Sequence, residues 1–295
     1  MTWLQLEMLL DAGEVECVEA AFNAAGAMSV TCCDAADNPL YEPGPLPPPL
    51  WPHTQVSALF PSAVDADTLR AVLAAALGRL PPHRFTPLAD RDWEREWLKD
   101  SKPMRFGRRV WIVPSAYALP DPRGINVRLD PGLAFGTGTH PTTALCLEWL
   151  DAAALAGKTV VDYGCGSGIL AIAAGLLGAA RVRAVDNDPQ ALTATCENAR
   201  RNHVDAQIEI GPPENLPAAP VDVVLANILA APLIKLAPRF AASVKAGGEL
   251  VLSGILSDQD SEVRAAYAPW FRFGPGAQRE GWRRLDAHRK PESHY

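Results

Sequence analysis

The sequence predicts an α/β protein built from two parts: a parallel sheet with helices on both faces, preceded by a smaller α+β domain. Three observations predict this architecture. From residue 139 to residue 255, apolar strands alternate with helices, which is typical of parallel strands buried on both faces. Residues 1–88 follow a β-α-β-β-α-β order, the ferredoxin-like arrangement. A stretch rich in Trp and in charged residues, 90–114, separates the two patterns.

The first part alternates between apolar strands and amphipathic helices. Val18 and Phe22 recur at helical spacing, and either Asp65 or Asp67 suits the N-cap of a second helix. The segment "NPLYEPGPLPPPLWP" (38–52) predicts a loop because proline interrupts regular structure, and the sequence assigns no role to its prolines at 43–52. The expected strands cover 1–10, 27–33, 54–60 and 83–88, and the expected helices cover 14–25 and 62–80.

The stretch between the two patterns predicts a connector. Trp93 and Trp97 lie four residues apart, so a helix would place both on one packed face and leave the alternating charges in solvent. A boundary near residues 90–100 follows from this interpretation. We therefore divide the chain into a domain over 1–90, a connector and entry to the larger domain over 91–130, and the larger domain over 131–295.

Each element of the larger domain carries a local signal. Asp188 suits an N-cap, and Pro189 suits the first helical position. Pro232 falls in the first turn of its helix, whereas Pro238 predicts a kink or a break. The expected helices cover 139–153, 167–178, 188–202 and 229–244, and the expected strands cover 159–164, 181–186, 206–211, 221–227 and 247–255.

Composition narrows the function classes. The 295 residues are 48% hydrophobic and 21% charged, with a net charge of −7, so a sizeable core is expected and binding to nucleic acid is not. The acidity fits a cationic partner and also simple solubility. The six cysteines show no C-x-x-C and no zinc-ligand spacing, which favours reduced thiols and no metal.

The sequence also carries no sign of export or of a membrane. The N-terminus lacks a basic region and meets acidic residues early, unlike a signal peptide. The longest apolar run, "GILAIAAGLLGAA", is too short to span a bilayer. We therefore expect a cytoplasmic protein, and we expect it to be a monomer.

A glycine turn follows the first strand of the larger domain. In "VVDYGCGSGILAIAA" (160–174), Gly164, Gly166 and Gly168 form G-x-G-x-G. The dinucleotide fingerprint needs a third Gly or Ala where Ile169 stands. Asp162 precedes the turn, and a carboxylate there disfavours a second anion such as pyrophosphate and suits a cationic or neutral ligand.

Two further polar residues end neighbouring strands. Asp186 follows the next strand, where an acid accepts both hydroxyls of a ribose. The alternative is that Asp186 is the N-cap of the following helix, but Asp188 is better placed for that role. Glycine turn and acid together indicate an adenosine cofactor, and the form D-x-G-x-G-x-G favours S-adenosylmethionine over a dinucleotide. Asn227 ends the fourth strand, where its amide oxygen could accept an amine N–H and direct the lone pair at a methyl carbon. No general base is evident.

The glycine- and threonine-rich stretch "LDPGLAFGTGTHPTT" (129–143) looks like a phosphate cradle. It lacks the G-K-[ST] ending, so no lysine reaches toward a phosphate. We interpret it as a flexible wall over the methionine end of the cofactor, with Thr143 offering its hydroxyl and Phe135 shielding the sulfonium. Its glycines would let it open for exchange.

Four motifs together resemble one family. "LDPGLAFGTGTHPTT", "DYGCGSGILAIAA", "DNDPQAL" and "NILAAPL", in this order and spacing, closely resemble the ribosomal protein L11 methyltransferase family. "DWEREWLKDSKPMRFGRRVWI" looks like that family's connector. The resemblance is strong over residues 90–260 and looser in the N-terminal third.

The resemblance implies a fold and an activity. The larger domain would be a Rossmann-like, seven-stranded class I methyltransferase domain, and residues 1–90 would recognise the substrate. The reaction would transfer methyl groups from S-adenosylmethionine to lysine ε-amines and the N-terminal α-amine of ribosomal protein L11. The cofactor positions that carry over are Thr143, Gly164, Gly166, Asp186 and Asn227, with Asn227 also positioning the amine.

Three alternatives remain at this point. The chain could methylate another amine, in a protein or a small molecule, since "NILA" lacks the aromatic wall of the N-P-P-[YF] motif. It could be a catalytically silent binding module, which the complete set of cofactor residues disfavours. A dehydrogenase is the third, disfavoured by Ile169.

Overall fold

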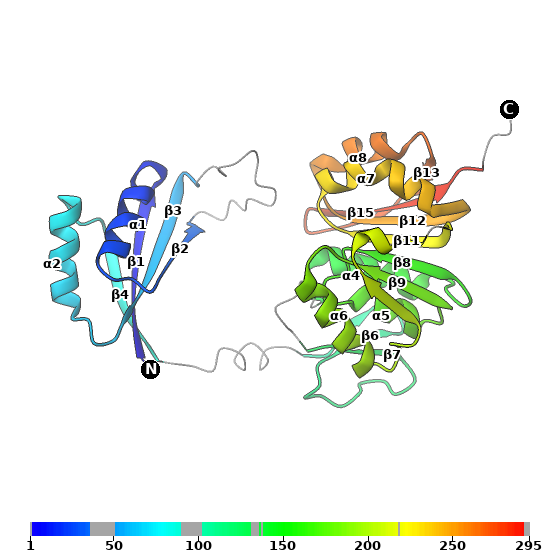
Figure 1. Ribbon diagram of the computed structural model, residues 1–295, viewed down its shortest axis with the longest axis horizontal. Coiled ribbons are helices and arrows are strands. Elements are labelled where there is room, and N and C mark those ends of the chain that lie inside the picture. The colour runs from blue at the N-terminus through cyan, green and yellow to red at the C-terminus, as the bar shows by residue number, and fades with distance from the viewer. Residues whose placement is uncertain are drawn as a thin grey trace. The chain divides into compact units, whose positions relative to one another are not determined.

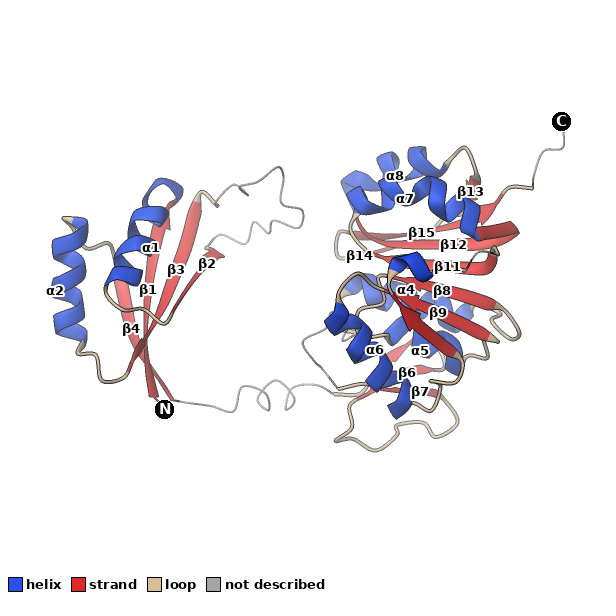
Figure 2. Ribbon diagram, in the orientation of Figure 1, coloured by secondary structure: helices blue, strands red, loops and turns tan. Residues whose placement is uncertain are grey.

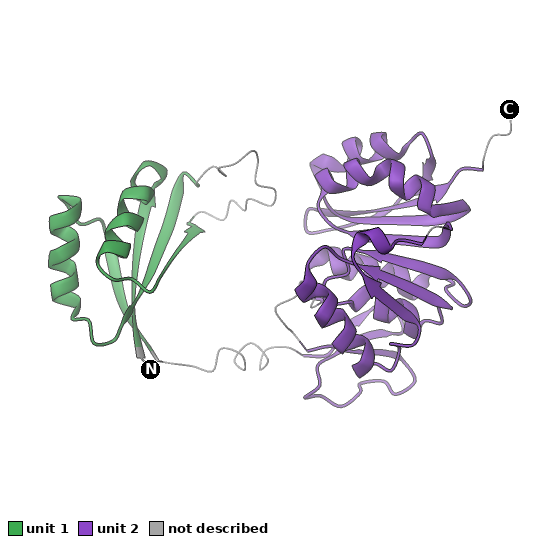
Figure 3. Ribbon diagram, viewed as in Figure 1, with its two compact units in different colours: residues 1–96 green, residues 97–295 purple. Residues whose placement is uncertain are grey.

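Two compact units make up the chain, Met1–Glu96 and Trp97–Tyr295 (Figure 3). The computed structural model describes residues 2–35, 51–89, 102–130, 136, 138–217 and 219–291. The described buried residues of the first unit form one hydrophobic cluster, and those of the second form two more. Each unit therefore has a core of its own.

The first unit is a four-stranded sheet with two helices. Its strands lie in the order β2-β3-β1-β4, and each neighbouring pair is antiparallel. Along the chain the elements follow the order β-α-β-β-α-β: β1 (Thr2–Asp11), α1 (Val15–Ala24), β2 (Ser29–Asp34), β3 (His53–Pro61), α2 (Ala66–Leu77) and β4 (His83–Ala89).

Period-two alternation places the core of this unit on one face of its sheet. Leu6 and Met8 on β1 are buried with Phe60 on β3 and Phe22 on α1, because every second side chain of a strand points to the same face. The rings of Phe22 and Phe60 meet edge to face at 6.2 Å. Asp65 is the N-cap of α2 and accepts the backbone N–H of the third helical residue at 2.8 Å, so Asp67 is not the cap.

The second unit contains an eight-stranded sheet, ordered β10-β9-β8-β11-β12-β15-β13 with β14 paired to β15 (Figures 1 and 2). The first five strands of this order pair in parallel, as predicted. The sheet as a whole is mixed, because β15 runs antiparallel to β12 and to β13. The strands are β8 (Thr159–Tyr163), β9 (Arg181–Val185), β10 (Ile208–Gly211), β11 (Val221–Asn227), β12 (Val244–Leu256), β13 (Phe271–Phe273), β14 (Ala277–Arg279) and β15 (Trp282–Arg289).

The family resemblance implies seven strands, whereas this sheet has eight, and the additional strand lies at one edge. β13 pairs with one end of β15 and β14 pairs with the other. Both therefore lie along the same neighbour, one after the other, separated by Gly274 to Gly276. Gly276 has a φ of +65°, and a Cβ there would lie 2.3 Å from the carbonyl oxygen of Arg284. The glycines thus break the edge strand in two.

Helices cover both faces of the central strands (Figure 1). Val160 and Leu225 are buried with helices α4, α5 and α6, whereas their neighbours Val161 and Val224 are buried with α7 and α8. This alternation explains the unbroken apolar strands of the sequence. Pro238 lies inside α7 and does not end it, so the helix is not broken there. The helices are α4 (Pro141–Ala152), α5 (Ile169–Leu176), α6 (Pro189–Arg201), α7 (Ala230–Ser243) and α8 (Asp260–Tyr267).

A three-stranded sheet precedes α4, where the sequence predicted a connector and the entry to the larger domain and no strands. It consists of β5 (Met104–Phe106), β6 (Val110–Val113) and β7 (Ile125–Arg128), and its buried side chains join the core of α4 and α5. Strands of three or four residues are too short for a periodic signal. The elements after residue 256 were also not predicted, and β15 lies inside the large sheet, between β12 and the edge strands β13 and β14.

Several sequence predictions lie outside the described residues. They are the helical placement of Trp93 and Trp97, most of the proline-rich loop, and Phe135. Over the described part of the chain, no helix is both long and apolar enough to cross a membrane.

Candidate active site

The candidate site lies where three neighbouring parallel strands end. β9, β8 and β11 are adjacent in the sheet. Asp186 directly follows β9, Gly164 directly follows β8, and Asn227 is the last residue of β11. Since the carboxyl ends of parallel strands meet at one edge, the fold brings the three predicted residues together at the edge where open α/β sheets bind ligands.

The glycine turn needs its glycines for conformation and for space. Gly164, Gly166 and Gly168 have φ values of +78°, +55° and +80°, a region that other residues enter only at a cost. A Cβ on Gly164 would lie 2.4 Å from Cγ2 of Ile228, the residue after Asn227. Ile169 then begins α5 and is buried in the core, so the residue that departs from the dinucleotide fingerprint serves packing.

Asp186 ties the glycine turn to the end of β9. Its carboxylate accepts the backbone N–H of Gly166 at 2.9 Å and that of Asp188 at 3.0 Å. The N-cap of α6 is Asp188, which accepts the N–H of Gln190 at 2.8 Å. Asp186 is therefore not the helix cap, and it is half-buried beside the turn.

Thr143 and Asn227 meet although they are 84 residues apart in the chain. The amide nitrogen of Asn227 donates a hydrogen bond to the Thr143 hydroxyl at 3.4 Å. Thr143 is buried in the first turn of α4, whose N-cap is His140. Because the amide nitrogen has this partner, the amide oxygen of Asn227 is the atom left to accept a further hydrogen bond.

Asp162 is the most unusual group at this edge. Its side chain is 0% exposed. One carboxyl oxygen, Oδ2, accepts the backbone N–H of Ala171 in α5 at 2.9 Å, whereas Oδ1 has no hydrogen-bond partner among the described residues. Burial raises the pKa of Asp162, the Ala171 N–H partly opposes the rise, and the negative charge of Asp186 adds to it, so that the pKa is about 7.

Comparisons with known proteins bear on this arrangement. The family model described as ribosomal protein L11 methyltransferase (PrmA) matches residues 2–290. The chain belongs to this family. A ribosomal protein L11 methyltransferase of Azotobacter vinelandii is 52% identical over 292 residues, covering 98% of this chain and 100% of that protein. One of Pseudomonas aeruginosa is 52% identical over 294 residues, covering 99% and 100%.

A solved structure agrees with the assignment to the L11 methyltransferase family. The ribosomal protein L11 methylase of Lactobacillus delbrueckii subsp. bulgaricus superposes with a TM-score of 0.58 at 33% sequence identity. The match covers 65% of this chain and 100% of that chain. The resemblance seen in the sequence motifs therefore extends to nearly the whole sequence and to much of the fold.

Three supporting residues of this family member were missed by the sequence analysis. On α6, the Thr195 hydroxyl donates to the carbonyl oxygen of Gly166 at 3.0 Å, and the Asn198 amide donates to that of Ser167 at 2.9 Å. Ser167 in turn donates its hydroxyl to the carbonyl oxygen of Gly136 at 2.6 Å. All three side chains are buried. Polar residues three apart on an otherwise apolar helix face were the available signal.

The glycine-rich stretch 129–143 is thereby tied to the glycine turn at Gly136. A Cβ on Gly136 would lie 2.9 Å from the Ser167 hydroxyl oxygen, and one on Gly138 would lie 3.2 Å from the Met104 terminal methyl. Residues 131–135 and 137, including Phe135, are outside the described residues.

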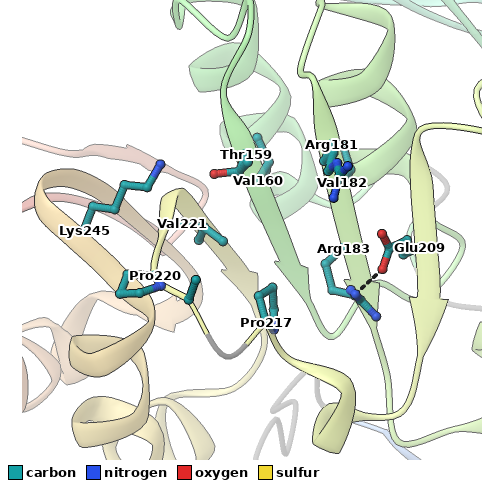
Figure 4. Close-up of a pocket in the computed structure, with 11 residues that line it drawn as sticks. Thr159, Val160, Arg181, Val182, Arg183, Glu209, Pro217, Pro220, Val221 and Lys245 are labelled. Atoms are coloured by element: carbon teal, nitrogen blue, oxygen red, sulfur yellow. Dashed lines mark ion pairs between the residues drawn. The ribbon is translucent and has the colours of Figure 1, made fainter.

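A cavity of about 360 Å³ lies at the opposite ends of the strands (Figure 4). Thr159 and Arg181 line it from the first residues of β8 and β9, and Lys245 lines it from the start of β12. Arg183 in its wall is ion-paired with Glu209. The five predicted site residues do not line this cavity, and we place the candidate site at the carboxyl ends on the topological argument.

Proposed function

We propose that this protein transfers methyl groups from S-adenosylmethionine to lysine ε-amines and the N-terminal α-amine of ribosomal protein L11. The observation that carries the proposal is the convergence of the family's motif residues at one sheet edge, in a chain that matches the family over residues 2–290. Gly164, Asp186 and Asn227 end adjacent strands, and Thr143 is hydrogen-bonded to Asn227.

The donor set at this edge fits the proposed cofactor. S-adenosylmethionine supplies a methyl group already activated by its positively charged sulfur. Asp186 has carboxylate oxygens to accept ribose hydroxyls, and the Gly166 backbone leaves room for a close approach. Among the described residues, one buried oxygen of Asp162 has no hydrogen-bond partner and no cation acts directly on the carboxyl group, which suits a positively charged ligand and not a pyrophosphate.

Asn227 would position the accepting amine. Its amide nitrogen donates to Thr143, which fixes the amide plane and leaves the oxygen to accept an N–H of the incoming amine. A neutral amine held this way directs its lone pair along the line of displacement, and orientation is the main service the protein must supply. No general base is assigned, because solvent can take the released proton.

The two units would divide the work. We assign substrate recognition to residues 1–90, the connector and the entry to the catalytic domain to 91–130, and methyl transfer to 131–295. The sheet order β2-β3-β1-β4 supports a ferredoxin-like recognition domain, and the seven-strand path that ends at β13 supports a class I methyltransferase domain. The protein would act as a cytoplasmic monomer, without a metal and without direct contact to nucleic acid.

The direct test uses the purified protein, purified ribosomal protein L11 and an isotopically labelled methyl donor. We expect the label to enter L11, and mass spectrometry of L11 peptides to locate it on lysines and on the N-terminus. An Asp186→Ala variant, which should bind the donor more weakly, is expected to incorporate less label at a donor concentration that does not saturate it. Incorporation into other amines and none into L11 would show that the chain methylates a different substrate, and no incorporation at all would refute the enzyme.

A second experiment tests the recognition domain. A chain beginning at residue 97 keeps the two core clusters of the second unit intact, since neither includes a residue before Met104. We expect it to bind S-adenosylhomocysteine with the affinity of the full chain and to lose methylation of L11. Full retention of L11 methylation would show that residues 1–90 do not recognise the substrate.

A further inference from the structure

Asp162 is a buried acid, and among the described residues no cation is a direct electrostatic partner of its carboxyl group. The ionisable groups that interact with it are Asp186, Cys146 from α4 and Cys165 from the glycine turn. Arg284 on β15 acts on Cys146 and is itself ion-paired with Asp286 at 2.7 Å. α5, which packs over it, contributes only the backbone N–H of Ala171. Residues 131–135 and 137, which the structure does not describe, carry no ionisable side chain in the sequence.

This environment holds the carboxyl group near the point where it gains or loses a proton. A fully buried carboxylate with one hydrogen bond has lost most of its hydration without gaining a counter-charge. The unpartnered Oδ1 makes the neutral and the ionised form close in free energy, and the nearby Asp186 charge favours the neutral form. A cation that enters the site would reverse the balance, because attraction to a positive charge favours the ionised carboxylate.

The two cofactor forms of a methyl transfer differ by one positive charge. The sulfonium sulfur of S-adenosylmethionine is cationic, whereas the thioether sulfur of S-adenosylhomocysteine is neutral. Their amino and carboxylate groups are the same. Asp162 stands at the carboxyl end of β8, two residues before the first glycine of the turn, so it is placed to feel this difference.

We propose that Asp162 senses the charge of the bound cofactor: it ionises when the cationic methyl donor binds and regains a proton when the neutral product is left. The inference rests on the proposed function and deepens it, because it assigns to one residue the selection of donor over product. Asp162 acts on the cofactor through its charge and does not itself form or break a bond in the methyl transfer.

The proton and charge balance closes over one cycle. On donor binding, neutral Asp162 releases its proton to solvent. In the transfer, the bond between methyl carbon and sulfur breaks, its electron pair stays on sulfur, and the amine nitrogen forms the new bond to carbon. The positive charge moves to the methylated amine, which later gives a proton to solvent. Asp162 then faces a neutral sulfur and takes up a proton from solvent.

The sign of the pH effect follows from this cycle. Below the titration range of Asp162, the donor must displace a proton to bind, so its apparent affinity falls as pH decreases. Above that range the carboxyl group is already ionised and the affinity levels off. The product displaces fewer protons, so the ratio of donor affinity to product affinity rises with pH toward neutrality and then becomes constant.

Calorimetry on the full chain tests the proposal. Binding of S-adenosylmethionine and of S-adenosylhomocysteine is measured between acidic and alkaline pH, in buffers of different ionisation enthalpy, which counts released protons. We expect more proton release with the donor than with the product. The ratio of affinities should change by at most about tenfold per pH unit below neutrality. The comparison of the two ligands removes contributions from the other ionisable groups of the site. It is made below neutrality, where the amino groups of both ligands are protonated, because the sulfonium charge lowers the pKa of the donor's own amino group.

Variants then assign the effect. In Asp162→Asn the extra proton release and the pH dependence of the ratio should both vanish, whereas Asp205→Asn, an exposed acid, should keep both. Equal proton release with the two ligands in the unmodified chain would overturn the proposal without any variant, as would an unchanged profile in folded Asp162→Asn. Failure of both ligands to bind at any pH would overturn the proposed cofactor itself and this inference with it.

Discussion

Replacing Asp186 with alanine should loosen the glycine turn and weaken cofactor binding together. The change removes the acceptor of two backbone N–H groups, Gly166 at 2.9 Å and Asp188 at 3.0 Å. The Asp188 N–H is in an exposed residue and can bond to water, whereas Gly166 is half-buried. We therefore expect the Gly166 bond to account for most of a stability loss of about 1–2 kcal/mol.

The loss of affinity should be of the same order or larger. If Asp186 also accepts the ribose hydroxyls, its removal leaves those hydroxyls without a partner at a cost of about 1–3 kcal/mol. This corresponds to binding that is roughly 5- to 150-fold weaker. Asp186→Asn keeps one oxygen for the Gly166 N–H but loses the second acceptor, so its affinity should fall between those of the native protein and Asp186→Ala.

Calorimetric titration with S-adenosylhomocysteine and thermal denaturation measure the two effects separately. Asp188→Ala is the matched control, because it removes the N-cap of α6 and should cost about 1 kcal/mol of stability while leaving cofactor affinity unchanged. Native affinity in Asp186→Ala would refute the reasoning. Equal affinity losses in Asp186→Ala and Asp188→Ala would show that the effect comes from helix α6 and not from the ribose.

Three more outcomes are expected. Asn227→Ala should reduce turnover of L11 more than it reduces cofactor affinity, since the lost amide oxygen would face the amine. Steady-state kinetics measure the turnover and calorimetry measures the affinity, and equal losses in both would contradict the prediction. Gly168→Ala should lower the free energy of unfolding by about 1–3 kcal/mol, because the new Cβ would lie 2.8 Å from Cγ2 of Thr195 on a residue with a φ of +80°. Adding Thr195→Ser removes that methyl group and should restore part of the loss, as measured by urea denaturation. Burial raises the pKa of Asp162 above that of the unfolded chain, to about 7. The free energy of unfolding of the unliganded protein should therefore fall, relative to that of Asp162→Asn, by up to about 4 kcal/mol as pH rises from about 4 to about 7. Parallel curves of unfolding free energy against pH for the two proteins would refute this.

Much of the fold was predictable because its signals are local. The elements of the N-terminal unit and those from α4 to β12 were expected within a few residues of their observed bounds, since apolar periodicity and caps are properties of short segments. Asp188 and Pro189 begin α6 as expected. The short strands β5 to β7 were not predicted because three or four residues cannot show a period. β15 was missed because its apolar residues Trp282, Leu285 and Ala287 do not keep a period of two.

The sequence by itself determined the two-part α/β organisation, the glycine turn between a strand and a helix, and the family through four ordered motifs. Only the tertiary structure decided which distant residues meet. It joins Asn227 to Thr143 across 84 residues, it supports the turn with Thr195 and Asn198 from α6, and it buries Asp162 with one oxygen unpartnered. The physical reason is that local conformation follows from neighbours along the chain. Hydrogen-bond partners and burial depend instead on which strands lie side by side in the sheet and on which helices cover them.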